Sequence, residues 1–354
     1  MTPLPAVSTL RTRLIELVTG TLVEIEDRYA PRFQLPRFFA GHRTGPNDPT
    51  ELIFIAGHLH RLGVTTLAGM TPAAIIEQQL RALDGPAVHT FGCYRVAEGL
   101  AAFGRWDTNP IIQSLDATSR DNILQAIDAT AAYDRERRAL RGQAENYWGV
   151  LARCEVARRS LGVAHDGKLL ATAVQRVIDK LTRNPLGYFD DSPDHAGVYD
   201  IYSPDTLLFV EPLWSMLPAD VLRESLRRHD ATLGSLYHEC GASITWGRSI
   251  GALSIALSIE WAAAGLAHGF GPRARHLGVL QHAIARFTDG FDAGLTTAHR
   301  MREQDGYRGI ARLMQMTLDL LGKASFAAVA LGEAPDTPHP EPIELFADRD
   351  ELIR

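Results

Sequence analysis

Two segments of the sequence are apolar on almost every side when they are read as helices. The first spans residues 249–267 (SIGALSIALSIEWAAAGLA) and the second spans residues 310–331 (IARLMQMTLDLLGKASFAAVAL). A helix without a polar face must be surrounded by other helices. Amphipathic segments such as residues 166–183 (DGKLLATAVQRVIDKLTR) would then form an outer layer. The sequence therefore predicts two layers of helices with the two apolar segments inside.

The rest of the chain has helical spacing as well, and alternating runs of β-branched residues are essentially absent. The 354 residues, 45% of them hydrophobic, are enough for a large core. We therefore predict an all-α fold of about a dozen helices, arranged as an (α/α) toroid, either incomplete or a six-hairpin barrel. Helix-like segments begin near Ser8, Thr50, Thr71, Phe91, Ser119, Asn146, Gly167, Pro204, Pro218, Arg248, Pro272 and Gly309.

Composition changes near the end of the chain. Residues 1–332 are expected to form one catalytic domain, whereas residues 333–354 contain several prolines that end the helical region. This tail is interpreted either as a linker toward a further domain or as a frayed terminus.

Charge and targeting signals narrow the possible partners. The net charge is −6 and no run of Lys or Arg forms a footprint for nucleic acid. No secretory signal and no run of 18 apolar residues is present, so we expect a cytoplasmic protein that does not bind membranes. The three cysteines, Cys93, Cys154 and Cys240, include no CxxC pair and are all expected to be buried thiols. The sequence leaves the oligomeric state open.

Residues typical of active sites gather before every second helix. If successive helices alternate in direction, those starting near Phe91, Asn146, Pro204, Arg248 and Gly309 begin at the same end of the fold. The segments leading into them (HTFG, QAENYW, HAGVYDIYSPD, YHECGASITWGR and DGYRG) are rich in His, Tyr, Trp, Asn, Arg and Asp. The opposite end carries plain turns. We therefore predict a binding cleft at the end where these helices begin.

Several of these residues also have purely structural interpretations. Asn146 could simply cap a helix, and Ser203 is expected to be an N-cap with Asp205 favoured in the following turn. Arg248 is different, because a cation at a helix N-terminus opposes the helix dipole and needs a carboxylate nearby, from the protein or from a ligand. Trp148 and Trp246 are either core aromatics or platforms for sugar rings.

No cofactor or metal is expected. His58 and His60 are two residues apart and point to different sides of a helix, and the HECGA segment lacks the second histidine of a zinc protease motif. A phosphate-binding loop, a dinucleotide fingerprint and a GxSxG elbow are also absent from the sequence.

Three motifs occur in a characteristic order: NYW at 146–148, YFDDSP…YDIYSP at 188–204, and ITWGRS at 244–249. Between about residues 146 and 267, this order resembles the heparinase II/III-like toroids and related (α/α)-toroid enzymes that act on uronic-acid glycans. The resemblance implies a toroid that is often followed by a β-sandwich domain, which would lie beyond the tail.

The resemblance also implies roles for individual residues in a lyase. Asn146 and Arg248 would neutralise the uronate carboxylate. Tyr202 would protonate the leaving oxygen, and His195 or Tyr199 would abstract the C5 proton. Donors directed at that carboxylate would stabilise the developing carbanion.

Three hypotheses for function follow. The first is β-elimination on a polysaccharide or oligosaccharide, by the residues just named. The second is exo-acting, uronosidase-like hydrolysis by a pair of carboxylates, and the third is a non-catalytic helical scaffold. The candidate carboxylates are Asp190, Asp191, Asp194, Asp200 and Glu239, and the candidate substrate-binding residues are Trp148, Tyr188, Trp246, Tyr307 and Arg308.

Overall fold

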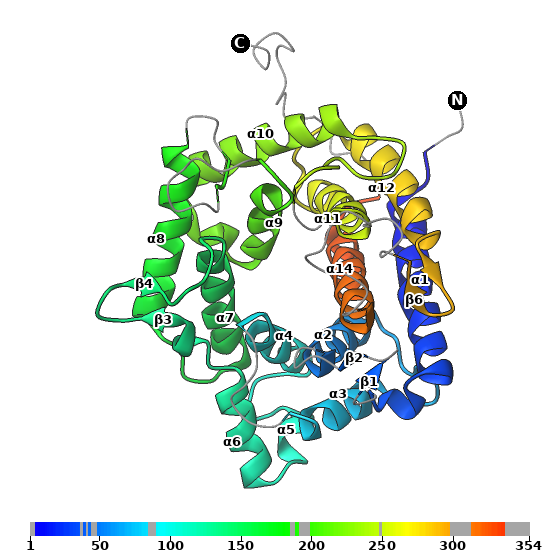
Figure 1. Cartoon of the computed structure of the whole chain (residues 1–354), viewed down its shortest axis with the longest axis vertical. Coiled ribbons are helices and arrows are strands. Elements are labelled where there is room, and N and C mark those ends of the chain that lie inside the picture. Colours follow the sequence, from blue (N-terminus) through cyan, green and yellow to red (C-terminus); the bar gives the residue numbers. More distant parts are fainter. Residues whose placement is uncertain are drawn as a thin grey trace.

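The computed structural model describes residues 4–35, 38–39, 42–43, 48–83, 90–184, 188–190, 199–247, 250–297 and 313–336. Helices dominate these residues (Figure 1), which confirms the predicted all-α class. The strands within the described ranges form three small antiparallel hairpins with two residues in each strand. They are β1 (Phe38–Phe39) with β2 (His42–Arg43), β3 (Tyr133–Asp134) with β4 (Ala139–Leu140), and β5 (Phe291–Asp292) with β6 (Leu295–Thr296).

Six helices contact one another in a closed ring (Figure 1). Going around the ring, α2 contacts α4, α4 contacts α7, α7 contacts α9, α9 contacts α11, α11 contacts α14, and α14 returns to α2. We call these six the ring helices. They are α2 (Asp48–Arg61), α4 (Thr90–Ala101), α7 (Tyr147–Leu161), α9 (Tyr202–Phe209), α11 (Ala252–His268) and α14 (Leu313–Glu333).

A second set of helices lies outside the ring (Figure 1). Among them, α1 packs on α14, α3 on α2, α8 on α7, and α12 on α11. Every residue of α11 from Ala252 to Leu266 is buried, as expected for the apolar segment 249–267. The outer helices are α1 (Val7–Arg28), α3 (Pro72–Arg81), α5 (Pro110–Gln113), α6 (Ala117–Ala126), α8 (Gly167–Arg183), α10 (Ala219–Leu236) and α12 (Arg273–Thr288), with short 3-10 turns at Pro31–Phe33, Thr130–Ala132 and Glu211–Met216.

Contacts along neighbouring ring helices show that the helices share a direction. The rings of Phe91 and Tyr147, at the starts of α4 and α7, are 5.4 Å apart. Farther along the same two helices, Glu98 pairs with Arg153. Because an early residue meets an early residue and a later one meets a later one, α4 and α7 begin at the same end of the ring.

Side-chain caps explain many of the helix starts. Thr71 accepts a hydrogen bond from Ala74 N at the start of α3, and Asp166 accepts from Lys168 N and Leu169 N at the start of α8. These polar caps satisfy backbone donors that have no partner within the helix. The expected starts near Thr71 and Gly167 are therefore confirmed.

One local expectation was wrong. Ser203 is not an N-cap, because α9 already begins at Tyr202, whose backbone N–H donates to Asp200 Oδ1 at 3.0 Å. Helices α10 and α12 begin near Pro218 and Pro272, as predicted, with each proline one position before the first helical residue. Helix α6 begins at Ala117, near Ser119, whose backbone N–H donates to the capping Asp116.

The helix predicted to begin near Arg248 begins later in the chain. Helix α11 begins only at Ala252, after Gly251, which has a φ of 77°. A positive φ suits glycine and interrupts a right-handed helix. Arg248 therefore precedes the first turn, so the helix dipole no longer requires a carboxylate beside it. The position of Arg248 lies outside the described residues.

The cysteines are not all alike. Cys93 and Cys154 are buried, as expected, but Cys240 is exposed in the segment between α10 and α11. The expectation that all three are buried was wrong: the small residues after Cys240, among them Ala242 and Ser243, are buried, but Cys240 itself is exposed.

Two further features bear on the expected organisation. None of the helices in the described parts of the chain is both long and apolar enough to cross a membrane.

Helix α14 extends to Glu333, so the boundary expected after residue 332 falls at the end of this helix. Residues 337–354 lie outside the described residues.

Candidate functional site

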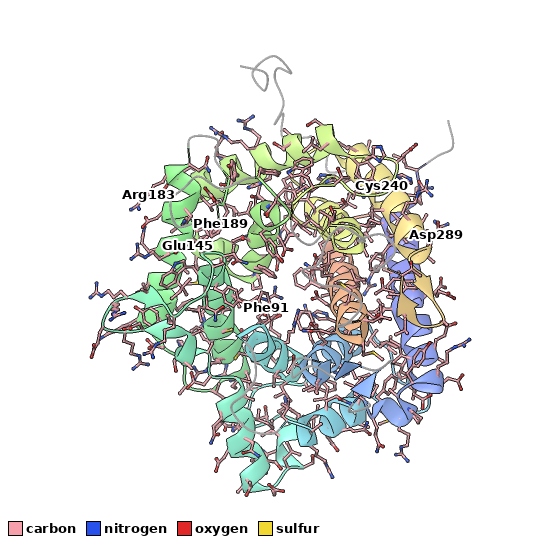
Figure 2. The ribbon with its side chains drawn as sticks, viewed as in Figure 1. Phe91, Glu145, Arg183, Phe189, Cys240 and Asp289 are labelled. Atoms are coloured by element: carbon pink, nitrogen blue, oxygen red, sulfur yellow. The ribbon has the colours of Figure 1, made fainter. Side chains whose placement is uncertain are left out.

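Buried ion pairs link the ring helices to one another, and Phe91 lies toward the interior of the ring (Figure 2). Lys323 of α14 donates to Asp205 Oδ1 of α9 and to Glu260 Oε2 of α11, and both distances are 2.8 Å. The two acidic side chains are 5% and 6% exposed. We call these three residues the Lys323 cluster.

The electrostatics of this cluster separate its two carboxylates. Burial raises the pKa of Glu260 to about 7; the charge of Lys323 opposes this shift and that of Asp205 adds to it. For Lys323, burial disfavours the charged form, but the charges of Asp205 and Glu260 outweigh burial and raise its pKa. Glu260 can therefore hold a proton near neutral pH beside a permanently charged ammonium group.

A second group of side chains surrounds Arg153 of α7. Its Nε and Nη2 donate to the two carboxylate oxygens of Glu98 at 2.7 and 2.8 Å. Its guanidinium carbon lies 4.4 Å from the ring centre of Tyr94, 5.1 Å from that of Phe326 and 5.8 Å from that of Phe54. We call these five residues the Arg153 cluster.

A third cation, Arg95 of α4, bridges two further ring helices. It forms an ion pair with Glu51 of α2 and donates to Asp319 Oδ1 of α14 at 2.8 Å. Buried ion pairs of this kind contribute little to stability after the cost of desolvation. Several of them together inside one ring therefore indicate a functional site more than a stabilising device.

The loops that lead into α9 and α11 meet each other. Trp246 Nε1 donates to the backbone carbonyl of Tyr199 at 2.8 Å, and the indole is 38% exposed. The backbone of Gly247 lies against Asp200, because a side-chain carbon at Gly247 would come within 3.0 Å of that side chain. This contact brings together two of the motifs that carried the resemblance.

Tyr199 is unsuited to act as a base. Its hydroxyl lies 3.0 Å from Nδ1 of His229 on α10, and burial raises its pKa. Burial also lowers the pKa of His229 to about 3, so this pair is neutral near pH 7. Of the two candidate bases, only His195 remains consistent with proton abstraction, and it lies outside the described residues.

Asn146 occupies the N-cap position of α7 but does not cap it. Its backbone has helical angles, and its side chain makes no capping hydrogen bond. The residue is 4% exposed, and within the described parts of the chain its Oδ1 atom has no hydrogen-bond partner. Buried polar atoms nearly always have a partner, so an unpaired amide oxygen here is suited to a ligand.

The remaining candidates occupy different environments. Tyr202, Asp190 and Asp200 are buried, and Tyr188 is half-buried with its ring 5.2 Å from that of Tyr199. These residues lie in or beside the loop before α9, close to the contact with Trp246.

Two candidates lie away from the charged groups of the ring. Trp148 is buried between the ring of Tyr133 and the guanidinium of Arg176, which is the environment of a core aromatic. Glu239 is exposed between α10 and α11, where its backbone carbonyl accepts a hydrogen bond from Arg286 Nε. The candidates outside the described residues are His195, Arg248, Asp191, Asp194, Tyr307 and Arg308.

The charged residues inside the ring were not among the predicted site residues. Asp205 was expected only as a favourable residue in a first helical turn. The available signal was the isolated charge itself. Glu260, Asp319 and Lys323 are single charged residues within otherwise apolar helices, and a charge in such a place needs a partner.

The histidines of α2 behave as the sequence predicted. His58 is buried, with its Nδ1 2.9 Å from Ser325 Oγ, whereas His60 is exposed and stacks on Phe103. They therefore cannot share a metal ion. Within the described ranges, no group of three or more His, Cys, Asp or Glu residues is arranged to hold one.

Comparison with known proteins adds no family to this description. No protein-family model matches the sequence, and no curated protein matches it.

Proposed function

We propose that this protein is a carbohydrate-active enzyme that hydrolyses a glycosidic bond in a uronic-acid-containing glycan. The two layers of helices would form an (α/α) toroid, with the reaction inside the ring. The observation that carries the proposal is the Lys323 cluster, in which one ammonium group holds two buried carboxylates from different ring helices.

Hydrolysis of a glycoside requires one protonated carboxyl group and one ionised carboxylate. Glu260, with a pKa of about 7, is suited to protonate the leaving oxygen. Asp205 is suited to act as the second carboxyl group of the pair, because Lys323 Nζ donates to its Oδ1 at 2.8 Å. Burial therefore favours the protonated form of Glu260, although Lys323 beside it opposes this shift.

The spacing of the pair bears on the stereochemical outcome. Asp205 Oδ1 and Glu260 Oε2 each lie 2.8 Å from Lys323 Nζ, so these two oxygens are at most twice that distance apart. Retaining glycosidases separate their two carboxyl groups by about 5 to 5.5 Å, whereas inverting enzymes need more room for a water molecule. The cluster therefore favours retention of configuration, with Asp205 as the nucleophile.

Aromatic and cationic groups support a sugar acid as the substrate. The rings of Phe91 and Phe209 are 5.5 Å apart, and Lys323 Nζ lies 5.6 Å from the ring of Phe209. Aromatic rings offer apolar surface for the faces of a sugar, while cations attract its carboxylate.

β-Elimination is the second candidate, and Asn146 favours it. Its buried amide is unpaired at Oδ1, and a rotation of the amide would place its N–H₂ group at the same point. With Arg248 it could then bind the uronate carboxylate, while Tyr202 and His195 transfer protons.

One experiment separates these functions. The protein is incubated with hyaluronan, heparosan, alginate oligosaccharides and oligogalacturonides, and both reducing ends and the ultraviolet absorbance of unsaturated uronates are followed. Hydrolysis is expected to produce reducing ends without new absorbance. A parallel rise in both signals would establish elimination instead. No reducing ends from any glycan would contradict both reactions and favour the helical scaffold.

A further inference from the structure

Arg153 reaches across the interior of the ring. It belongs to α7, yet its guanidinium lies 5.1 Å from the ring of Phe326 on α14. These helices are not neighbours, because α4 and α2 separate them on one side, and α9 and α11 on the other. The side chain of Arg153 therefore extends to the opposite wall.

This crossing is held in place from several directions. The two hydrogen bonds to Glu98 form a bidentate pair, and rings from three different helices pack around the guanidinium. A bidentate pair holds the guanidinium in one orientation, and cation–π contacts strengthen when they are desolvated. The Arg153 side chain is only 5% exposed. The crossing is therefore a fixed barrier and not a swinging side chain.

A second layer of contacts supports the barrier. On α2, His58 lies one turn beyond Phe54, and their rings are 4.1 Å apart. The same imidazole lies 5.8 Å from Phe326 and hydrogen-bonds to Ser325. The interior is thus filled on the far side of Arg153 as well as at Arg153 itself.

We propose that the Arg153 cluster closes the ring, so that the enzyme takes only the end of a glycan chain and removes terminal units. This inference rests on the proposed function. Arg153 follows Tyr147 by six residues, which places the barrier about 9 Å below the start of α7 at about 1.5 Å per residue. A chain that had to pass through the ring would meet this barrier.

The position of the Lys323 cluster fits cleavage next to the barrier. Phe326, whose ring lies 5.1 Å from the Arg153 guanidinium, follows Lys323 by three residues on α14, so these two side chains lie on the same side of that helix. Lys323 and, more weakly, Arg153 both oppose the rise in the pKa of Glu260. The proposed proton donor therefore lies within electrostatic reach of the residue that ends the channel. A bond cleaved there would be near the chain end that touches the barrier.

Product lengths test this inference directly. Hexasaccharides of hyaluronan, heparosan and galacturonan are labelled with 2-aminobenzamide at the reducing end, and early products are separated by size. The expected early products are one terminal unit and a labelled chain shortened by that unit. Labelled fragments of intermediate length at early times would overturn the closed ring but leave the proposed hydrolysis intact. Absence of cleavage would overturn both.

A variant tests whether Arg153 is the barrier. The double change Arg153→Ala with Glu98→Ala removes both charges together, so neither is left buried and unpaired. It is expected to yield intermediate fragments, whereas Arg176→Ala, which changes a cation on the outer helix α8, should keep the parental products. Unaltered products from a folded double variant would refute the assignment. If circular dichroism shows that the double variant is unfolded, the viscosity of a polymer solution treated with the parent protein gives the test instead. The parent protein should release sugar from polymeric hyaluronan or heparosan without an early fall in viscosity. An early fall would overturn the closed ring.

Discussion

The ammonium group of Lys323 on α14 lies 2.8 Å from a carboxylate oxygen of Glu260 on α11. The lysine also binds Asp205, so a single cation serves two acidic groups. The net charge of the Lys323 cluster is zero when one of its two carboxyl groups holds a proton. Burial raises the pKa of Glu260 to about 7, which makes it the proton-holding member.

Replacing Glu260 tests its role as the acid. Glu260→Gln should reduce kcat for glycan cleavage by about a hundredfold or more, since a general acid contributes about 10² to 10⁴ in rate. In the parent protein, activity should fall as pH rises through about 7, because the carboxyl group then loses its proton.

Glu155→Gln provides the matched control. Glu155 is another buried carboxylate with a raised pKa, but it binds Asp166 N and Arg158 on α7. This variant should retain turnover. Full activity in Glu260→Gln, or an equal loss in both variants, would remove Glu260 from the mechanism.

The same pKa shift makes stability depend on pH. A glutamate with an ordinary pKa of 4.5 has lost its proton in the unfolded chain at pH 6, whereas Glu260 in the folded protein still holds one. The folded state therefore binds more protons, and its contribution to the free energy of unfolding falls as pH rises from about 4.5 to about 7. The expected fall is on the order of 3 kcal/mol.

Denaturant unfolding at a series of pH values measures this term. The difference in the free energy of unfolding between the parent protein and Glu260→Gln should fall as pH rises, because the amide of the variant does not titrate. Parallel curves for the two proteins across this range would mean that Glu260 is ionised in the folded state.

The parts of this structure that were predictable are those that depend on local pattern. The uniform apolarity of residues 249–267 identified α11 as an interior helix. The alternation of helices predicted that those starting near Phe91 and Asn146 begin at the same end of the fold, and the contacts between α4 and α7 bear this out. These inferences needed only periodicity and helix direction.

The parts that were missed depend on which residues meet across the ring. Nothing in the local sequence shows that Lys323 reaches Asp205, more than a hundred residues earlier. Likewise, Asn146 looks like a cap in sequence, and only its backbone angles and unpaired Oδ1 show that it is not. Tertiary contacts, and not propensity, assign these roles.

Tyr199 is expected to be dispensable for turnover. Tyr199→Phe removes the hydroxyl bound to His229 Nδ1 and should cost about 1 to 3 kcal/mol of stability, since a buried ring nitrogen loses its partner. Tyr237→Phe is the control, because the hydroxyl of Tyr237, the residue that follows α10, contacts His282 Nδ1 of α12 in a similar pair. Both variants should keep kcat. A loss of turnover confined to Tyr199→Phe would restore it as a proton-transfer group.

Trp246 should affect substrate binding more than chemistry. Its indole is 38% exposed and is oriented by the hydrogen bond to the Tyr199 carbonyl. Loss of stacking worth about 1 kcal/mol should raise KM about fivefold in Trp246→Ala, with kcat unchanged. Met216→Ala, at a position with 37% exposure, should leave both constants unchanged. Equal KM values for Trp246→Ala and the parent would exclude the indole from the binding surface.

Asn146 offers a comparison between a functional and a structural asparagine. Asn109 caps α5 by accepting from Ile111 N and Ile112 N, and it also donates to Leu100 O. Asn109→Ala should therefore lose about 1 kcal/mol or more of stability while keeping turnover. Asn146 makes no capping bond, so Asn146→Ala should have little effect on stability.

Turnover of Asn146→Ala should instead fall about 10- to 100-fold, because a hydrogen bond to a charged carboxylate contributes about 1.5 to 3 kcal/mol. Thermal unfolding and initial rates on the same protein preparations separate the two effects. Normal turnover with reduced stability in Asn146→Ala would make this residue a structural one like Asn109. Normal turnover with unchanged stability would show that its unpaired amide does not contact the glycan.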